Sequence, residues 1–242
     1  MKLKGFNVII TLPVLFLLFP GYVATAERES TFTDPRDGHV YKTIKIGDQT
    51  WMSENLAYLP SVVGPDDQTD IDGETKPAFY VYGYDGTNVS EAKEMLTYET
   101  YGVLYSFLAA KTACPPGWHL PSEQEWKVLE NFLEIATDQS KFVVLNKAGA
   151  EHKLIKSTGW KQPAANVAGF SALPGGFRTS GNPRAGTKGY FAYLNDEAFF
   201  WTSTVYKDSK LAGWKGISAS SSGIFGSVQR FSKGYSVRCI KD

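Results

Sequence analysis

Apolar and polar positions in the first part of the chain alternate in the manner of a β-hairpin. Residues 39–46 alternate, residues 47–48 can form a turn, and residues 49–52 return as a second strand. Residues 199–206 and 235–240 are rich in aromatic and β-branched side chains, which favour strands. The pattern therefore predicts several short strands.

Residues 122–136 carry the clearest helix signal. Ser122 is followed three positions later by Glu125, the spacing of a capping box. Apolar side chains then recur at helical spacing on one face: Trp126, Leu129 and Leu133. We expect a helix from about Ser122 to Ala136.

Three other segments have less regular patterns. Residues 91–110 can be partly helical, but Gly102 interrupts them, and residues 101–105 could instead form a strand. Residues 61–76 are polar and acidic, as in a loop. Residues 156–216 are punctuated by Gly and Pro and rich in aromatics, and we expect a long loop region there.

Residues 1–26 have the features of a secretory signal peptide. Two lysines precede an almost wholly apolar run at 9–19, and Ala-Thr-Ala at 24–26 fits a cleavage site. This run is shorter than the roughly 20 residues that cross a bilayer, although an uncleaved membrane anchor remains the alternative. We expect a mature chain 27–242 that has no transmembrane segment and is secreted, periplasmic or on the cell surface.

The composition of this mature chain is typical of one neutral domain. Removing 26 residues from 242 leaves 216, enough for a single core. The removed segment holds two of the 25 basic residues and none of the 25 acidic ones, so the net charge becomes −2. That balance argues against nucleic acid or anionic lipid as a partner.

The mature chain contains two cysteines, Cys114 and Cys239. Export favours a disulfide between them over free thiols. Closing a loop this long stabilises a fold by up to about 4–5 kcal/mol on the chain-entropy model. The sequence spacing leaves open whether the two Cα atoms come within bridging distance.

Six segments together resemble the Fibrobacter succinogenes major paralogous domain, and they occur in the family's order over nearly all of residues 34–242. They are IGDQTWMSENLAY (46–58), YGVLYSFLAA (101–110), CPPGWHLPSEQEW (114–126), GFSALPGGFR (169–178), FWTSTVY (200–206) and YSVRCIKD (235–242). That family resembles a branch of the C-type-lectin-like superfamily, and HLPSEQEW is similar to the matching segment of formylglycine-generating enzymes. The motifs therefore predict both family and fold.

The resemblance implies an α+β domain with a C-type-lectin-like fold. Such a fold has small mixed or antiparallel sheets, one or two helices, paired termini and a long loop region. The family also implies secreted or surface-bound bacterial proteins with roles in adhesion or carbohydrate binding. It has no generally assigned reaction, so the resemblance predicts fold better than function.

Catalytic motifs are absent from the sequence. Both cysteines match framework positions of the family, which leaves none for the redox or copper chemistry of the formylglycine-generating relatives. The three histidines, His39, His119 and His152, are too scattered to predict an iron site, and we expect His119 to be a structural donor. The chain has no GxSxG, HExxH or phosphate-binding loop, although a scattered triad stays open. We expect neither an enzyme nor a cofactor.

One acidic segment could bind calcium. Residues 66–74 hold four Asp and one Glu, but their spacing does not fit an EF-hand. The calcium triplets of sugar-binding lectins are also missing, and residues 201–203 read Trp-Thr-Ser where Trp-Asn-Asp would stand. We expect folding without a metal, while calcium binding by this segment stays open.

Aromatic residues provide the candidate ligand site, because their rings can stack on the apolar faces of sugars. We expect four of them to be exposed anchors: Trp160, Tyr190, Tyr193 and Trp214. Polar partners in the same region are Asn166, Asn182, Asn195, Arg178 and Arg184. The tryptophans inside the family motifs are expected in the core: Trp51, Trp118, Trp126 and Trp201.

The leading hypothesis is a non-catalytic recognition module that binds a polysaccharide, surface glycan or surface protein through residues 160–214, without calcium. One alternative is a passive surface or matrix protein. Another is a glycan-active enzyme with an unrecognised site. A large exposed aromatic patch would favour binding, and a deep pocket with converging carboxylates would favour an enzyme.

Overall fold

The computed structural model describes residues 29–66, 76–133, 159–161, 166, 168–181, 185–206, 209–218 and 224–242. The expected signal peptide at 1–26 lies outside these residues, as does all of the acidic segment 66–74 except Asp66. His152 also lies outside them.

The first sheet has five strands in the order β1-β2-β3-β12-β6, and all its neighbours are antiparallel. The strands are β1 (Ser30–Thr33), β2 (Val40–Ile46), β3 (Gln49–Met52), β6 (Trp118–His119) and β12 (Ile240–Lys241). The predicted hairpin at 39–52 is confirmed, because β2 pairs with β3 from Thr43 opposite Met52 to Ile46 opposite Gln49. The alternating pattern was sufficient to locate it.

The second sheet also has five strands, in the order β11-β10-β9-β7-β8. Its strands are β7 (Gly175–Thr179), β8 (Tyr190–Leu194), β9 (Glu197–Tyr206), β10 (Leu211–Ser218) and β11 (Ile224–Arg230). A two-stranded ladder of β4 (Phe79–Tyr80) and β5 (Leu104–Tyr105) stands apart from both sheets. The predicted strand at 199–206 is confirmed as part of β9.

Within the described residues, four short helices lie between the strands: α1 (Val89–Lys93), α2 (Leu96–Tyr101), α3 (Phe107–Ala113) and α4 (Glu123–Phe132). Ser122 caps α4 through the predicted capping box with Glu125. Helix α2 ends at Gly102, whose φ is +69°, and β5 begins two residues later. A Cβ at Gly102 would lie 2.7 Å from the carbonyl oxygen of Leu56, so the ambiguous 101–105 segment turns sharply there.

The expected α+β, C-type-lectin-like fold is wrong. The described part of the chain is mostly β, with 38% strand and 18% helix, and its two large sheets curl as half-barrels. The physical reason lies in the Gly-rich and Pro-rich region 156–216, where we expected loops apart from the strand at 199–206. Its aromatic and β-branched runs form β7 to β10 instead, and its glycines allow turns and close strand contacts.

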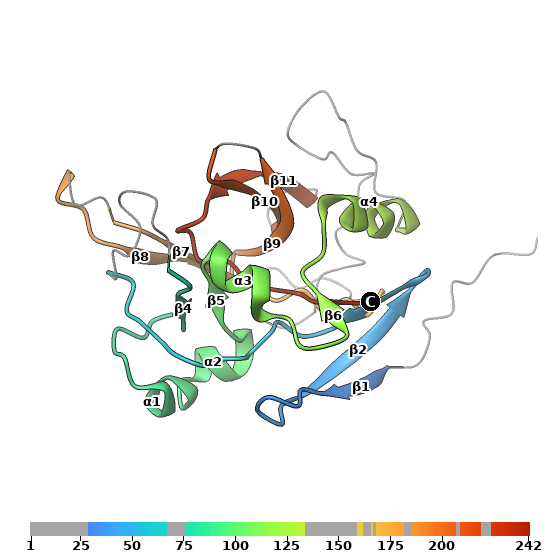
Figure 1. Cartoon of the computed structure of the whole chain (residues 1–242), viewed down its shortest axis with the longest axis horizontal. Helices are drawn as coiled ribbons and strands as arrows, with labels where there is room; N and C mark the ends of the chain where they lie inside the picture. The colour runs from blue at the N-terminus through green and yellow to red at the C-terminus, as the bar shows by residue number, and fades with distance from the viewer. Residues whose placement is uncertain are drawn as a thin grey trace, which may run out of the picture.

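The C-terminal segment joins the separate sheets. The predicted strand at 235–240 is largely wrong: residues 240–241 form β12, while Gly234, Tyr235 and Ser236 make single bridges to β7, β5 and β9. The backbone then bonds to Leu56 and Met52 in the first half of the chain. In Figure 1 this segment crosses the middle of the molecule and ends beside β6.

A buried guanidinium holds this segment in place. Arg238 has no exposed surface and donates to Asn55 Oδ1 at 2.7 Å and to the carbonyl oxygen of Met52 at 3.2 Å. It also donates to the carbonyl oxygens of Phe170 and Ser171 and lies over the Phe170 ring. Burial lowers the pKa of Arg238 to about 9, against the opposing attraction of Glu54.

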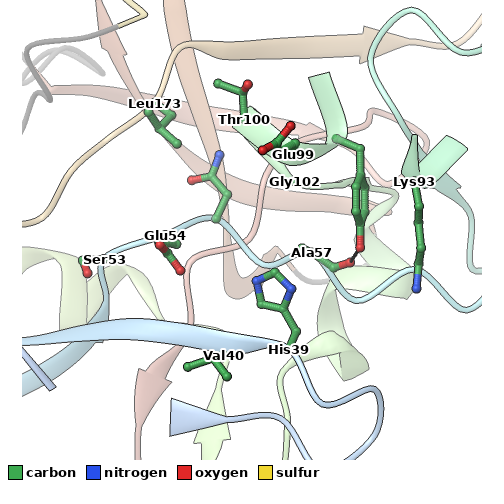
Figure 2. Close-up of a pocket in the computed structure, with 12 residues that line it drawn as sticks. His39, Val40, Ser53, Glu54, Ala57, Lys93, Glu99, Thr100, Gly102 and Leu173 are labelled. Carbon is green, nitrogen blue, oxygen red and sulfur yellow. Dashed lines mark hydrogen bonds between the residues drawn. The ribbon is translucent and has the colours of Figure 1, made fainter. Parts of the chain in front are cut away.

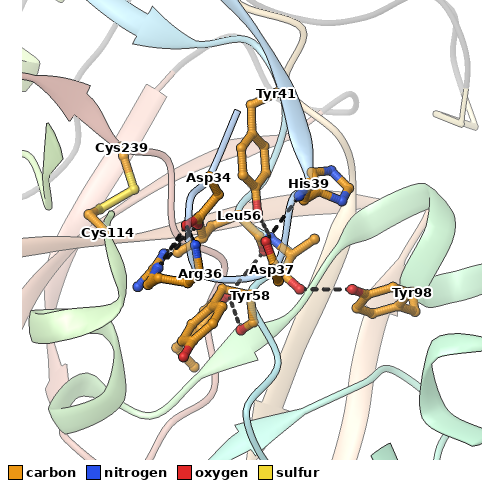
Figure 3. A network of polar contacts seen from close by, with 12 residues as sticks. Asp34, Arg36, Asp37, His39, Tyr41, Leu56, Tyr58, Tyr98, Cys114 and Cys239 are labelled. Atoms are coloured by element: carbon orange, nitrogen blue, oxygen red, sulfur yellow. Dashed lines mark hydrogen bonds and ion pairs between the residues drawn. A yellow bond between two sulfur atoms is a disulfide. The ribbon is translucent and has the colours of Figure 1, made fainter. Parts of the chain in front are cut away.

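The disulfide between Cys114 and Cys239 is present, as predicted, with 5.9 Å between the two Cα atoms. It links the end of α3 to the C-terminal segment, one residue after Arg238. Figure 3 shows it near a polar network in which Arg36 pairs with Asp34 at 2.6 Å. The bridge ties α3 to the C-terminal segment, and Arg36 connects the β1–β2 turn to the ring of Tyr58, 3.8 Å from its centroid.

Loss of the disulfide should destabilise the domain. Cys239→Ser should lower the free energy of unfolding by about 2–5 kcal/mol, because the unfolded chain regains the freedom of a 125-residue loop. The measurement is chemical denaturation of wild type and variant. Thiol labelling of the non-reduced, denatured wild type should find no free thiol, and two reactive thiols per chain would contradict the bridge.

His119 joins helix α4 to the C-terminal residue. Its Nε2 lies 2.7 Å from Glu125 Oε1, and its Nδ1 lies 2.6 Å from Asp242 Oδ1. Partial burial alone would lower the pKa of His119, but the hydrogen bonds to the two carboxylates outweigh it and raise the pKa above the usual 6.5. The geometry is that of the structural donor we expected.

The contribution of His119 should depend on pH with a defined sign. Because its folded-state pKa is raised, its stabilisation is fully present below the ordinary pKa of 6.5 and is lost as pH rises through the folded value. His119→Gln should therefore reduce stability most near about pH 6, by no more than about 1 kcal/mol since the pair is partly exposed. Urea unfolding of both proteins between about pH 6 and pH 9 measures this, and a pH-independent difference would rule the linkage out.

Candidate functional site

The second sheet has two different faces. On β9, Ala198 and Phe200 point to the core cluster that contains Trp126 of α4. Phe199 and Trp201 point to the opposite side and belong to the other large core cluster. Strand alternation therefore separates a side packed under α4 from a side built mainly of aromatic rings.

On that second side a group of rings spans all five strands, β7 to β11. Phe199 is buried at its centre, with ring centroids 5.2 Å from Phe177, 5.4 Å from Trp214 and 6.2 Å from Phe225. The surrounding rings are partly exposed. We call this surface the aromatic face and define it as Phe177, Tyr190, Tyr193, Phe199, Trp214 and Phe225.

Two tyrosines of edge strand β8 are the most exposed members. Tyr190 is 58% exposed and Tyr193 is 51% exposed. Tyr190 pairs with Thr179 and so shares its side of the sheet, two positions along from Phe177. Tyr193 stacks on Phe177, with centroids 5.5 Å apart and planes 26° apart. Both exposed rings therefore lie on the aromatic face.

The backbone at Tyr193 adopts a conformation that is rare for a large side chain. Its φ is +63°, in the left-handed region, and Gly176 on the neighbouring strand has φ +62°. A Cβ on Gly176 would lie 2.2 Å from the carbonyl oxygen of Ala192, so only glycine fits there. Strain of this kind persists where surrounding structure imposes it, and it occurs most often at functional sites.

Gly216 makes room for the rings on β10 and β11. A Cβ there would lie 2.6 Å from Phe225 and 3.0 Å from Trp214, so the missing side chain lets both rings lie close to the sheet. The indole Nε1 of Trp214 is buried and has no hydrogen-bond acceptor among the described residues. A buried, unpaired donor in a native protein requires an explanation, such as a water or a ligand.

Polar side chains border the rings. Lys233 lies over Phe177, with its Nζ 5.0 Å from the ring centroid, and donates to the Thr179 hydroxyl. Burial and the nearby charge of Arg178 lower the pKa of Lys233. At the other end, Glu197 shares a side of β9 with Phe199, and burial together with Asp196 raises the pKa of its carboxyl.

The structure brings together three of the four predicted anchors and separates the fourth. Tyr190, Tyr193 and Trp214 share the aromatic face, on strands and not on loops as we expected. Tyr190 and Tyr193 are exposed, whereas Trp214 is only partly exposed. Trp160 is 6% exposed and donates from its indole to the carbonyl oxygen of Ala172 at 3.1 Å, so its expected exposure is wrong.

The predicted polar partners are mostly engaged elsewhere. Arg178 is buried and donates to the carbonyl oxygens of Pro65 and Ser232. Asn166 bonds to Ser171, and Asn195 accepts from Tyr101. Asn182 and Arg184 lie outside the described residues. The motif tryptophans are buried as predicted: Trp51, Trp118, Trp126 and Trp201.

Sequence reasoning missed several members of the site. Phe177 stands in the GGFR motif, in which the neighbouring Arg178 was the predicted ligand contact. Phe225 lies in a run where polar Ser227 and Gln229 alternate with apolar Val228, which was the available signal for β11. Lys233 had no such signal, because its position over Phe177 depends on the turn before the C-terminal segment.

The structure adds no metal site and no membrane-spanning helix within the described residues. Among the described residues, no three His, Cys, Asp or Glu side chains are grouped as metal ligands. Calcium binding by 66–74 is untested, since almost all of that segment lies outside the description. No helix in the described part of the chain is long and apolar enough to cross a membrane.

Stability should distinguish the buried ring from the exposed one. Trp160→Ala should cost about 3–5 kcal/mol of unfolding free energy, because it leaves a cavity and an unpaired carbonyl. Tyr190→Ala should change stability by no more than about 0.5 kcal/mol, because its ring is mostly in solvent. Equal losses in urea denaturation would show that one ring is misplaced.

Comparison with known proteins identifies the family. The sequence profile of the Fibrobacter succinogenes major domain, a bacterial family, matches residues 44–241. No curated protein and no solved structure matches the chain, so no related fold supports the lectin assignment. Because the match covers most of the sequence, the chain belongs to the Fibrobacter succinogenes major domain family.

Proposed function

We propose that this protein is an exported, non-catalytic recognition module that binds a glycan through its aromatic face. The observation that carries the proposal is the pair of exposed tyrosines, Tyr190 and Tyr193, beside the partly exposed rings of Phe177, Trp214 and Phe225. Contiguous apolar surface that remains in solvent often marks a binding site.

The chemistry of these rings suits a carbohydrate. A tyrosine ring can cover the C–H groups on one face of a sugar while its hydroxyl stays in solvent. Because the rings stand on paired strands, little conformational entropy is lost when a ligand binds. Glu197, on the same side of β9 as Phe199, and Lys233, over Phe177, supply polar groups for sugar hydroxyls.

Two further observations support the other parts of the proposal. The disulfide is typical of an exported protein, because such bonds persist in oxidising compartments. Glu197 is the one carboxylate among the described strand residues on this side of the sheet, whereas most glycoside hydrolases use two. The proposed contacts are stacking and hydrogen bonds, so they require no calcium.

Tyr193→Gly tests the face with little risk to folding. Glycine readily adopts the positive φ at this position, so the backbone should remain intact while the ring is lost. A glycan array and polysaccharide pull-down, each with and without calcium, would identify a ligand for residues 27–242. Tyr193→Gly should then weaken binding by at least about 2 kcal/mol, roughly 30-fold, at an unchanged melting temperature.

Tyr206→Ala is the matched control. Tyr206 is also exposed, but its hydroxyl donates to Glu123 on α4, away from the aromatic face. It should bind like wild type. Wild-type affinity in both Tyr190→Ala and Tyr193→Gly would reject the site, and retention of a surface protein but no glycan would change the ligand class. Absence of any ligand would favour the passive surface role.

A further inference from the structure

A second site lies in a pocket on the side of the fold built by the N-terminal strands and the first two helices. Its volume is about 510 Å³, and it is lined by the start of β2, the segment after β3 and the α1–α2 region. Figure 2 shows Glu54, Glu99 and His39 facing the same space. None of its lining residues belongs to the aromatic face.

The pocket contains two carboxylates without a paired cation. Glu54 accepts one backbone hydrogen bond, from Lys42 N to its Oε2 at 3.2 Å, and its Oε1 has no partner among the described residues. The Glu99 carboxylate forms no hydrogen bond or ion pair with any described residue, although Lys93 lines the same pocket. The positive charge of Arg238 attracts Glu54, but Arg238 is wholly buried and forms no ion pair with it.

A third polar group at this site also lacks a partner. Ser53 lines the pocket and is 3% exposed, and its hydroxyl has no hydrogen-bond partner among the described residues. A buried hydroxyl without a partner is costly, and a bound polar group can supply one. This observation is independent of the two carboxylates.

The walls of the pocket are held rigidly. The Tyr98 hydroxyl donates to the carbonyl oxygen of Ala57 at 2.9 Å, which fixes its ring. Asn55 is fixed from behind by Arg238 and by a bond to the carbonyl oxygen of Tyr101 at 3.0 Å. A fixed aromatic ring beside free carboxylates is a suitable environment for an organic cation.

We propose that this pocket binds the primary ammonium group of a small polar molecule. Glu54 and Glu99 supply the charge, and carboxylate oxygens are the acceptors that the three N–H donors of an ammonium require. The ring of Tyr98 provides a further favourable surface. The ammonium could belong to an amino sugar or to a lysine side chain, and both sources present the same chemistry.

Three probes separate charge from shape and source. Glucosamine and glucose differ at one position, where an ammonium replaces a hydroxyl. Nα-acetyl-lysine N-methylamide, whose side chain is unmodified, presents the same ammonium on a peptide. NMR titration of the full mature chain should show glucosamine or the lysine probe shifting the backbone signals of 53–57 and 98–102. Glucose should leave them unchanged at the same concentrations.

Neutral variants complete the test. Glu99→Gln should weaken ammonium binding at least about tenfold, the equivalent of 1.4 kcal/mol, and should not affect folding because this side chain has no partner among the described residues. Glu54→Gln should have a similar effect on binding. Glu94→Gln is the matched control, since Glu94 caps the same helix region but does not line the pocket.

The outcomes are decisive in each direction. Shifts confined to these segments, reduced in Glu54→Gln and Glu99→Gln but not in Glu94→Gln, establish the site and identify the better ammonium source. The proposal is overturned if no ammonium probe shifts the pocket signals, or if glucose shifts them equally. It is also overturned if Glu99→Gln binds like wild type while its melting temperature is unchanged.

Discussion

The buried guanidinium of Arg238 is the interaction around which the two sheets are arranged. It carries charge without an adjacent carboxylate, and it is compensated by the side chain of Asn55 and three backbone carbonyls. Those acceptors come from β3, the segment after it and the 170–171 turn, so the segments must meet at one point. Its Nε has no hydrogen-bond partner among the described residues, so removing one of the acceptors would leave a second buried donor group of the same side chain without full pairing, which is costly.

This arrangement also determines where the two candidate sites lie. The C-terminal segment that carries Arg238 passes beneath the aromatic face, where Tyr235 stacks on Phe199 with centroids 5.3 Å apart. Farther along, Arg238 fixes Asn55 in the wall of the charged pocket. One buried segment thus supports two surfaces of different chemistry, one aromatic and one acidic.

Local signals in the sequence predicted local structure well. The hairpin at 39–52, the capping box at Ser122 and the strand at 199–206 each depend on neighbours within a few residues. The bridges of residues 234–236 depend on partners far away in sequence, so no periodic pattern could reveal them. The same limit explains Trp160, because an aromatic in an irregular stretch carries no sign of which side it faces. Tyr190 and Tyr193 were identifiable by residue type. The roles of Gly176 and Gly216 were not, because the atoms that leave no room for a Cβ at these positions belong mainly to neighbouring strands.

The long-range bonds of the C-terminal segment also have a kinetic consequence. Bonds from Arg238 to Asn55 and Met52 join residues 183 and 186 positions apart. Chains dominated by such distant contacts fold slowly, because the entropy of closing a long loop is lost before the contacts form. Neither sheet can acquire its final connection until residues near 240 have been synthesised. Until then the rings that pack against Tyr235, such as Phe199, lack that partner and stay accessible to chaperones.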